Sequence, residues 1–285
     1  MKIGNFQFAL SNFRWAFSNS PKGKRVLTAA LLLPVVIFFV LKAPPLYFFS
    51  LLSLIILLGL TELFTMLSRQ QQVCYPLPGL ILGELLALAF FLEKREWIQL
   101  VLTATPITLL VSQLFSRRDF WESTQGISNT LFAILYVSWS LSHFLPLREL
   151  EDGRGYVFFV LWVIWFGDTA AYYVGRSWGR HPLAGRISPK KTVEGAVGGL
   201  GGGLLGAWIA HTWFLGSWSA IHCLLVGLAL NALGQLGDLG ESLIKRGLEA
   251  KDSGSLLPGH GGMLDRVDSL LFAAPAMYYY LIMKG

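Results

Sequence analysis

Apolar residues are grouped in nine long runs along this chain, separated by short polar segments. The runs cover residues 26–41, 46–66, 77–92, 97–115, 127–147, 156–175, 195–215, 218–236 and 266–283. A helix that crosses a bilayer needs about 20 residues, with about 17 to 25 usual. The runs at 26–41 and 77–92 are short, so one of them could be re-entrant. The pattern predicts an all-α polytopic integral membrane protein with about nine transmembrane helices.

The composition supports a membrane-embedded chain. Only 14% of the 285 residues are charged, whereas soluble proteins carry about 25%, so polar residues are too few to cover a soluble globule. The formal net charge is +6. However, Lys and Arg lie between the apolar runs rather than in one basic patch, which indicates topology charge and not a nucleic-acid surface. Cys74 and Cys223 belong to no motif, and we expect free thiols.

The distribution of basic residues predicts the orientation in the membrane. If the N-terminus is cytoplasmic, six of the 23 Lys and Arg lie on the outer side, namely Lys42, Lys94, Arg95, Arg148, Arg154 and Lys284. The positive-inside rule favours this topology, and an odd number of spans then leaves the C-terminus outside. We therefore expect a multi-pass protein of the cell (inner) membrane.

The chain divides into three regions. Residues 1–25 place Phe and Leu at helical spacing among basic side chains, which is typical of an amphipathic helix on an anionic leaflet. Residues 26–150 are apolar spans joined by short loops, with few buried polar groups. Residues 156–285 carry almost all the polar residues at membrane depth and two cytoplasmic loops, so we expect the chemistry there.

Two of the later spans contain polar side chains that are costly in a bilayer. Asp168 lies toward the inner end of the sixth span, where a carboxylate costs roughly 2.5–3.5 kcal/mol and usually marks function. A hydrogen bond between packed helices would be the structural alternative. Asn231, Gln235 and Asp238 end the eighth run at spacings of four and three, so they share one helix face. A solvated helix end explains Glu241 but not this stripe.

The later cytoplasmic loop adds acidic residues and glycines. Asp265 and Asp268 are three positions apart at the start of the last run, and both side chains should point the same way. Residues 258–262 read PGHGG, a flexible backbone whose amides can approach an anion. We therefore expect a polar site at the inner end of the last span.

The earlier cytoplasmic loop carries a pair of lysines. Ser188 is expected to cap a helix whose first residue is Pro189. Lys190 and Lys191 would then lie beside unpaired amides at the positive end of a helix, which is a phosphate site. Topology charge alone would also explain the two lysines.

The expected chemistry follows from five aspartates near the inner interface: Asp168, Asp238, Asp252, Asp265 and Asp268. Their mutual repulsion favours a hard divalent cation, and Mg²⁺ binds carboxylates together with substrate phosphates. Gly201, Gly203 and Gly206 fit the dinucleotide fingerprint, but they lie in an apolar run without a preceding strand and indicate close helix packing. Lysines, glycine amides and a carboxylate-held metal are the parts of phosphoryl or nucleotidyl transfer.

Four segments make the sequence recognisable: SPKKTVEG, GDLGES, KRGLEAKDSG and LPGHGGMLDRVDS. They closely resemble the CDP-diacylglycerol synthase (phosphatidate cytidylyltransferase) family, and the resemblance is specific over about 156–275. It implies that CTP and phosphatidate react, with Mg²⁺, to give CDP-diacylglycerol and pyrophosphate. The number and identity of the cations stay open, including a second one. The active site would face the cytoplasm, where CTP arrives and the phosphate of a membrane lipid lies.

The resemblance and the residues together suggest roles for the polar side chains. Asp238, Asp265 and Asp268 would ligate metal, with Asp168 and Asp252 as further ligands or neighbours of the ligands. Other residues would bind the triphosphate, the lipid phosphate or the departing pyrophosphate: Ser188, Lys190, Lys191, Lys245, Arg246, Lys251 and Arg266. His260, Gly261 and Gly262 would shape the nucleotide pocket.

Three other interpretations stay open from the sequence. A CTP-dependent kinase of a polyprenol or phytol would transfer a bare phosphate, and a related synthase would use an ether lipid. An ion-coupled transporter also buries polar residues on glycine-rich helices, but it predicts polar sites in both halves of the chain. The small-residue ridges would suit a homodimer.

Overall fold

The computed structural model describes residues 33–254 and 261–284. The amphipathic helix expected for residues 1–25 lies outside the described residues, and so does His260. Within them, helices coincide with all nine apolar runs, the first of which is seen as a helix over residues 33–41. The expectation of an all-α architecture is confirmed, apart from one short hairpin.

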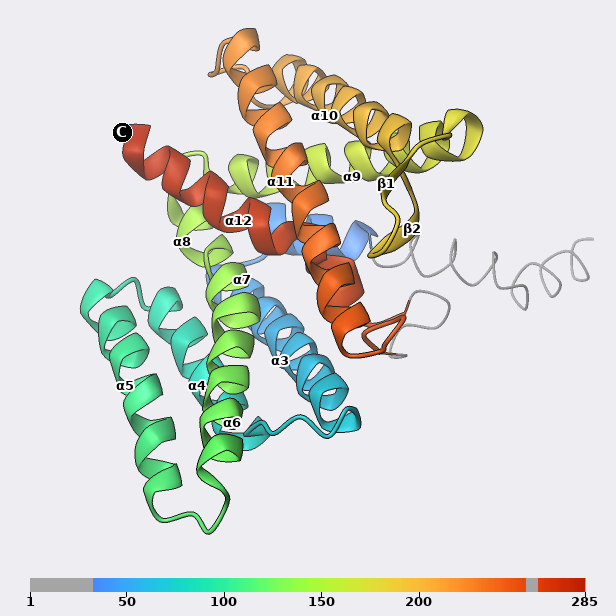
Figure 1. The fold of residues 1–285 in the computed structure, drawn as a ribbon. Coiled ribbons are helices and arrows are strands. Elements are labelled where there is room, and N and C mark those ends of the chain that lie inside the picture. Colours follow the sequence, from blue (N-terminus) through green and yellow to red (C-terminus); the bar gives the residue numbers. More distant parts are fainter. Residues whose placement is uncertain (1–32, 255–260, 285) are drawn as a thin grey trace, which may run out of the picture.

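The first half of the chain forms a group of helices, of which α4, α5 and α6 lie in the lower part of Figure 1. Its elements are α3 (Pro45–Arg69), α4 (Pro76–Phe91), α5 (Arg95–Leu114), α6 (Phe120–Ala133), the π-helical turn η1 (Ile134–Trp139), α7 (Ser140–Ser142) and α8 (Phe144–Glu149). The last four follow one another as a single helical stretch, Phe120–Glu149, that is long enough to span a membrane. Helices α3 and α4 each begin with a proline. Proline has no backbone N–H, but the first N–H groups of a helix have no partner within the helix, so proline is tolerated at this position.

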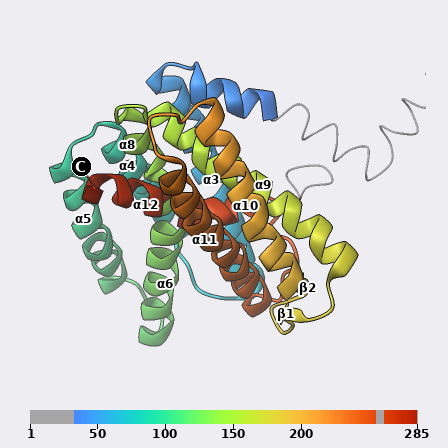
Figure 2. The ribbon, with the colours of Figure 1, turned by 90° about the horizontal axis from the view of Figure 1, so that it is seen from above.

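The second half begins with α9 (Gly153–Trp178), which leads into an antiparallel hairpin of β1 (Pro182–Ala184) and β2 (Ser188–Thr192). Three long helices follow: α10 (Val193–Trp213), α11 (Ala220–Gly247) and α12 (Leu264–Lys284). In Figures 1 and 2 the helices α9, α10 and α11 lie together, and the hairpin lies at one end of them. The inner loops of the sequence analysis therefore meet at that end.

Six of the described helices are long and apolar enough to cross a membrane, so the chain is a helical membrane protein. They are α3, α5, α9, α10, α11 and the helical stretch Phe120–Glu149. Helix α4 has only 16 residues, in agreement with the short run seen in the sequence. Helix α12 carries charged side chains in its first turn. The count of nine spans stays a prediction.

Glycines allow α10 to pack closely against its neighbours. A Cβ atom at Gly202 would lie 2.4 Å from the Cβ of Ala170, and one at Gly203 would lie 2.8 Å from the Cβ of Asn231. Only glycine permits such an approach of backbones. Gly203 and Gly206 lie inside α10 and pack against α11 and α9, as expected, whereas a Cβ at Gly201 would meet nothing within 4 Å.

The glycine ridge of α11 also packs within the chain. A Cβ at Gly234 would meet Ile164 at 2.3 Å, and one at Gly237 would meet the carbonyl oxygen of Asp268 at 2.6 Å. This ridge therefore serves α9 and α12 of the same chain, and it is not left open for the homodimer that the sequence suggested. Cys74 and Cys223 are free thiols, as expected.

The connection between α9 and α10 corrects one prediction. Residues Ser188–Thr192 form strand β2, so Ser188 does not cap a helix, and α10 begins only at Val193. The cap is Thr192, whose side chain accepts a hydrogen bond from the Gly195 amide at 3.1 Å. Lys190 and Lys191 accordingly extend from a strand rather than from the first turn of a helix.

Candidate active site

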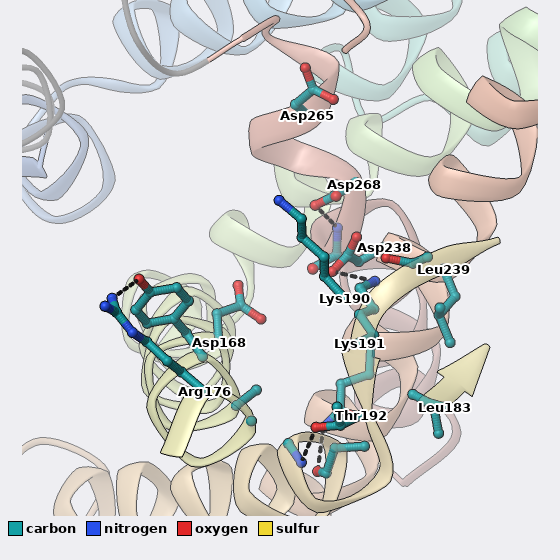
Figure 3. A pocket seen from close by; sticks show the side chains of 18 of the residues that line it. Asp168, Arg176, Leu183, Lys190, Lys191, Thr192, Asp238, Leu239, Asp265 and Asp268 are labelled. Carbon is teal, nitrogen blue, oxygen red and sulfur yellow. Dashed lines mark hydrogen bonds and ion pairs between the residues drawn. The ribbon is translucent and has the colours of Figure 1, made fainter. Parts of the chain in front are cut away.

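A cavity of about 780 Å³ lies between α9, the hairpin, α11 and the start of α12 (Figure 3). Eleven of the residues singled out from the sequence line it: Asp168, Ser188, Lys190, Lys191, Gln235, Asp238, Lys245, Asp252, Asp265, Arg266 and Asp268. Arg246, Lys251, Gly261 and Gly262 are not among the lining residues. The structure therefore brings together side chains that are up to 100 residues apart in the sequence.

Asparagine and glutamine side chains of α11 form hydrogen bonds with the neighbouring helices beside the cavity. Asn231 donates to the carbonyl oxygen of Val163 at 3.3 Å. Gln235 donates to the Asn231 side chain at 2.9 Å and to the Ala196 carbonyl at 3.2 Å. The first two residues of the polar stripe thus connect α9, α10 and α11, while Gln235 and Asp238 both line the cavity.

The hairpin presents two lysines to the carboxylates. Lys191 Nζ lies 2.6 Å from Asp238 Oδ2, which ties β2 to α11. In Figure 3, Asp168 stands across the cavity from Lys190, Lys191 and Asp238. Cations and carboxylates therefore line the same cavity, an arrangement that can hold the charges of a triphosphate and its cation.

Glu194 holds the hairpin in place. Its carboxylate accepts hydrogen bonds from the amides of Arg180 and His181, at 3.0 and 3.2 Å, and contacts the His181 ring at 2.5 Å. On the other side, Arg246 donates to the Ile187 carbonyl at 3.2 Å. Arg246 thus ties α11 to the hairpin that forms one wall of the cavity, and its contact with substrate stays a prediction.

Asp265 is the most heavily bonded carboxylate of the cavity. Lys245 Nζ lies 2.5 Å from Oδ1, and Oδ2 accepts from the amides of Ser253 and Gly262 at 3.0 and 2.8 Å. Gly261 precedes this contact with φ +80, a conformation that favours glycine. Gly261 and Gly262 therefore shape the backbone around Asp265.

Asp268 lies one helical turn beyond Asp265. One of its oxygens accepts the amide of Ser269 at 2.6 Å, and its backbone packs against Gly237 of α11. Among the described residues, no side chain donates a hydrogen bond to Asp168 or Asp268. Their carboxylates thus keep oxygens available for a ligand.

Oxygen donors make this cavity suitable for Mg²⁺. Asp168, Asp238 and Asp268 come from three different helices. Within residues 33–254 and 261–284, no three acidic, His or Cys side chains stand close enough to hold a metal ion by themselves. Mg²⁺ usually takes one or two carboxylates and completes its shell with waters and substrate phosphates, so the donor set fits this cation in the presence of a nucleotide.

Glu62 of α3 is a residue that the sequence analysis missed. It is 9% exposed, and it accepts hydrogen bonds from the backbone of Met263 and Leu264 at the start of α12. The signal was present, because Glu62 is a carboxylate within the apolar run 46–66. The expectation that the first half contributes few buried polar groups is wrong here.

Comparison with known proteins gives a consistent result. The model of the family described as "Cytidylyltransferase family" matches residues 23–283. A "Phosphatidate cytidylyltransferase" of Bacillus subtilis (strain 168) is 36% identical over 270 residues, which cover 90% of this chain and 97% of that protein. A protein of the same name from Staphylococcus aureus (strain COL) is 34% identical over 232 residues, covering 79% and 87%. The chain therefore belongs to the cytidylyltransferase family.

Proposed function

We propose that this protein transfers the cytidylyl group of CTP to phosphatidate, which yields CDP-diacylglycerol and pyrophosphate for phospholipid synthesis. The observation that carries the proposal is the cavity itself. Carboxylates from α9, α11 and α12 face two lysines of β2 within it. The relatives that match most of the length of this chain are named phosphatidate cytidylyltransferase. The activity is that of a membrane-bound nucleotidyltransferase.

The reaction needs positioning and charge neutralisation more than proton transfer. A phosphate oxygen of phosphatidate attacks the α-phosphorus of CTP, and the bond from that phosphorus to the bridging oxygen of the β-phosphate breaks. Because phosphatidate is already an anion, no strong general base is required. Holding the two phosphates in line and compensating their charge would supply most of the catalysis.

The aspartates would hold the required Mg²⁺. Asp168, Asp238 and Asp268 are the strongest candidates, because they come from three different helices around the cavity and each has at most one donor among the described residues. Both oxygens of Asp265 already accept hydrogen bonds, and Asp252 lies at the rim of the same cavity. A bound Mg²⁺ would neutralise phosphate charge and polarise the α-phosphorus.

The basic residues would bind phosphates from two sides. Lys190 and Lys191 of the hairpin would hold the triphosphate or the lipid phosphate. Arg266 and Lys245 line the cavity near the start of α12 and would stabilise the departing pyrophosphate. Lys191 now pairs with Asp238 at 2.6 Å, so a bound nucleotide would compete for it.

The proposed topology has nine spans with the N-terminus and the cavity on the cytoplasmic side. The contacts support it, because helix ends that should share a side do meet. The inner part of α3 contacts the start of α12 through Glu62, and Arg148, at the end of α8, donates to the carbonyl of Val40 at the end of the first helix. The positive-inside distribution of Lys and Arg then predicts which of the two sides is cytoplasmic.

The product of the purified protein tests the proposal. Detergent-solubilised protein is given phosphatidate, Mg²⁺ and CTP labelled either in the cytidine or in the γ-phosphate. We expect the cytidine label in the lipid product and the γ-label in pyrophosphate. A lipid that gains only the γ-phosphate would identify a kinase instead, and vesicle uptake of an ion without CTP turnover would identify a transporter.

A further inference from the structure

Glu62 is a carboxylate from the first half of the chain that is bonded to the catalytic segment of the second half. Its Oε1 accepts the Met263 amide at 2.8 Å, and its Oε2 accepts the Leu264 amide at 2.9 Å. The Ser253 hydroxyl also lies 2.8 Å from Oε2. These partners are about 200 residues away in the sequence, on both sides of the segment 255–260.

The two amides belong to the N-terminus of α12, which begins at Leu264. The first amides of a helix have no partner inside the helix, and the helix dipole favours a negative charge at that end. Side chains within a helix's own cap usually satisfy these amides. Here a distant helix does so, and Glu62 therefore fixes where α12 begins.

Two glycines leave the space that the Glu62 carboxylate occupies. A Cβ at Gly254 would lie 2.5 Å from Glu62 Oε1, and a Cβ at Gly262 would lie 2.4 Å from Oε2. Neither glycine has the positive φ that would by itself require glycine. The close approach of the Glu62 carboxylate accounts for the absence of a side chain at Gly254, and at Gly262 it does so together with Ser253 Oγ, which would lie 2.1 Å from a Cβ.

A chain of hydrogen bonds links Glu62 to the residues that line the cavity. The Ser253 hydroxyl lies between the two carboxylates, 2.8 Å from Glu62 and 3.1 Å from Asp265 Oδ2. The amide of Gly262 donates to the same Asp265 oxygen. Asp268 follows Asp265 by one helical turn, so the start of α12 sets the place of both aspartates.

We propose that Glu62 is a positioning residue: it caps α12 from α3, and Gly254 and Gly262 admit its carboxylate, so that Asp265, Arg266 and Asp268 face the cavity. This inference rests on the proposed function for its catalytic consequence. Its structural part, the contact between α3 and the start of α12, is independent of the reaction. The first half of the chain thus serves the site as well as the membrane.

The first test is Glu62→Gln, which keeps the size of the side chain. An amide nitrogen would face a backbone N–H of Met263 or Leu264, so one acceptor is replaced by a donor. We expect kcat to fall about 100-fold, since misplacing reacting groups by about 1 Å has an effect of this size. The KM for CTP should change far less, because Lys190 and Lys191 come from the hairpin. Hydrogen exchange at residues 261–268 should become faster.

Glu84→Gln is the matched control. Glu84 is a second carboxylate in an apolar helix of the first half, and it accepts a hydrogen bond from Ser53, which a glutamine can also accept. It does not line the cavity. We expect kcat and hydrogen exchange at 261–268 to match those of the unmodified protein.

A double-mutant cycle separates positioning from general loss of stability. The three heavy atoms nearest to a Cβ at Gly254 all belong to Glu62, so Gly254→Ala should reduce kcat about tenfold or more alone but about twofold or less when Glu62 is already alanine. The melting temperature in detergent should show the same non-additivity. Gly247→Ala is the control, since a Cβ there meets nothing within 4 Å.

The outcomes distinguish this inference from the proposed function. If the unmodified protein makes no CDP-lipid, the proposed function fails, while hydrogen exchange and the melting cycle still test the contact. If the protein is active, two results overturn the inference: unchanged kcat and exchange in Glu62→Gln, or additive effects of Gly254→Ala and Glu62→Ala. Should Glu62→Gln not fold, Gly254→Ala in the otherwise unmodified chain applies the same test.

Discussion

The two halves of this protein treat their buried polar side chains differently. In the first half such groups are scattered, and their contacts are local or structural: Thr130 donates to the carbonyl of Gly126 in its own helix, and Arg148 donates to carbonyls at the end of the first helix. Ser142 Oγ and His143 Nε2 are buried there without a hydrogen-bond partner among the described residues. In the second half, polar residues from α9, α11, α12 and the hairpin converge on one cavity. A polar residue at membrane depth therefore indicates a site only when several elements direct such residues to the same place.

Glu62 connects the two kinds of region. It lies in the first half but bonds to the start of α12, so the division into an anchoring half and a catalytic half is incomplete. If this comparison holds, substitutions in the cavity should reduce activity more than substitutions elsewhere in the chain.

The cavity carboxylates should show the largest effect. Asp268→Ala and Asp265→Ala should each lower the formation of CDP-lipid by about 10³-fold, because groups that stabilise charge in a transition state typically contribute this much. The assay follows labelled cytidine into lipid, with the melting temperature in detergent as a check of folding. Asp119→Asn is the matched control, since Asp119 caps α6 and an asparagine caps equally well. Near-normal turnover of both alanine variants would remove them from the site.

Lys191 should have a smaller effect, mainly on nucleotide binding. Lys191→Met removes the partner of Asp238 and one charge for the triphosphate. We expect kcat/KM for CTP to fall about 10²-fold, which corresponds to the loss of one hydrogen bond between charged groups at about 2–3 kcal/mol. An unchanged kcat/KM would show that the hairpin does not contact the nucleotide.

Packing glycines in the second half should affect stability more than chemistry. Gly202→Ala places a Cβ 2.4 Å from Ala170, and such overpacking typically costs about 1–3 kcal/mol. Gly201→Ala is the matched control in the same helix, because a Cβ there has nothing within 4 Å. Thermal unfolding in detergent should separate the two variants. Equal melting temperatures would contradict the close packing of α9 and α10.

Much of this architecture was predictable because it depends on local composition. Hydropathy located the helices, and the inner ends of α9, α11 and α12 carry charged residues that the orientation rule assigns to one side. The convergence of Asp168, Asp238 and Asp268 on one cavity followed from that shared side. The same reasoning could not choose which oxygens bind metal, since Asp265 proved to be occupied by Lys245 and backbone amides.

The remaining features depend on tertiary contacts. Ser188 followed by Pro189 is a good start signal for a helix, but Glu194 holds the preceding backbone and the segment becomes a strand. Glu62 has partners about 200 residues away, so its role could not be read from its neighbours. Its presence in an apolar run was nevertheless the same signal that identified Asp168.

The most direct test of the central claim is the sidedness and metal dependence of CDP-lipid formation in sealed vesicles. Phosphatidate-containing vesicles with the protein in both orientations are given labelled CTP and Mg²⁺ from outside, before and after permeabilisation. We expect label in lipid only where the cytoplasmic face is outward, full recovery of the remaining activity on permeabilisation, and loss of activity with EDTA that Mg²⁺ restores. Equal activity with the opposite face outward, or activity that survives removal of divalent cations, would contradict an inner-face site where carboxylates and a cation hold the nucleotide.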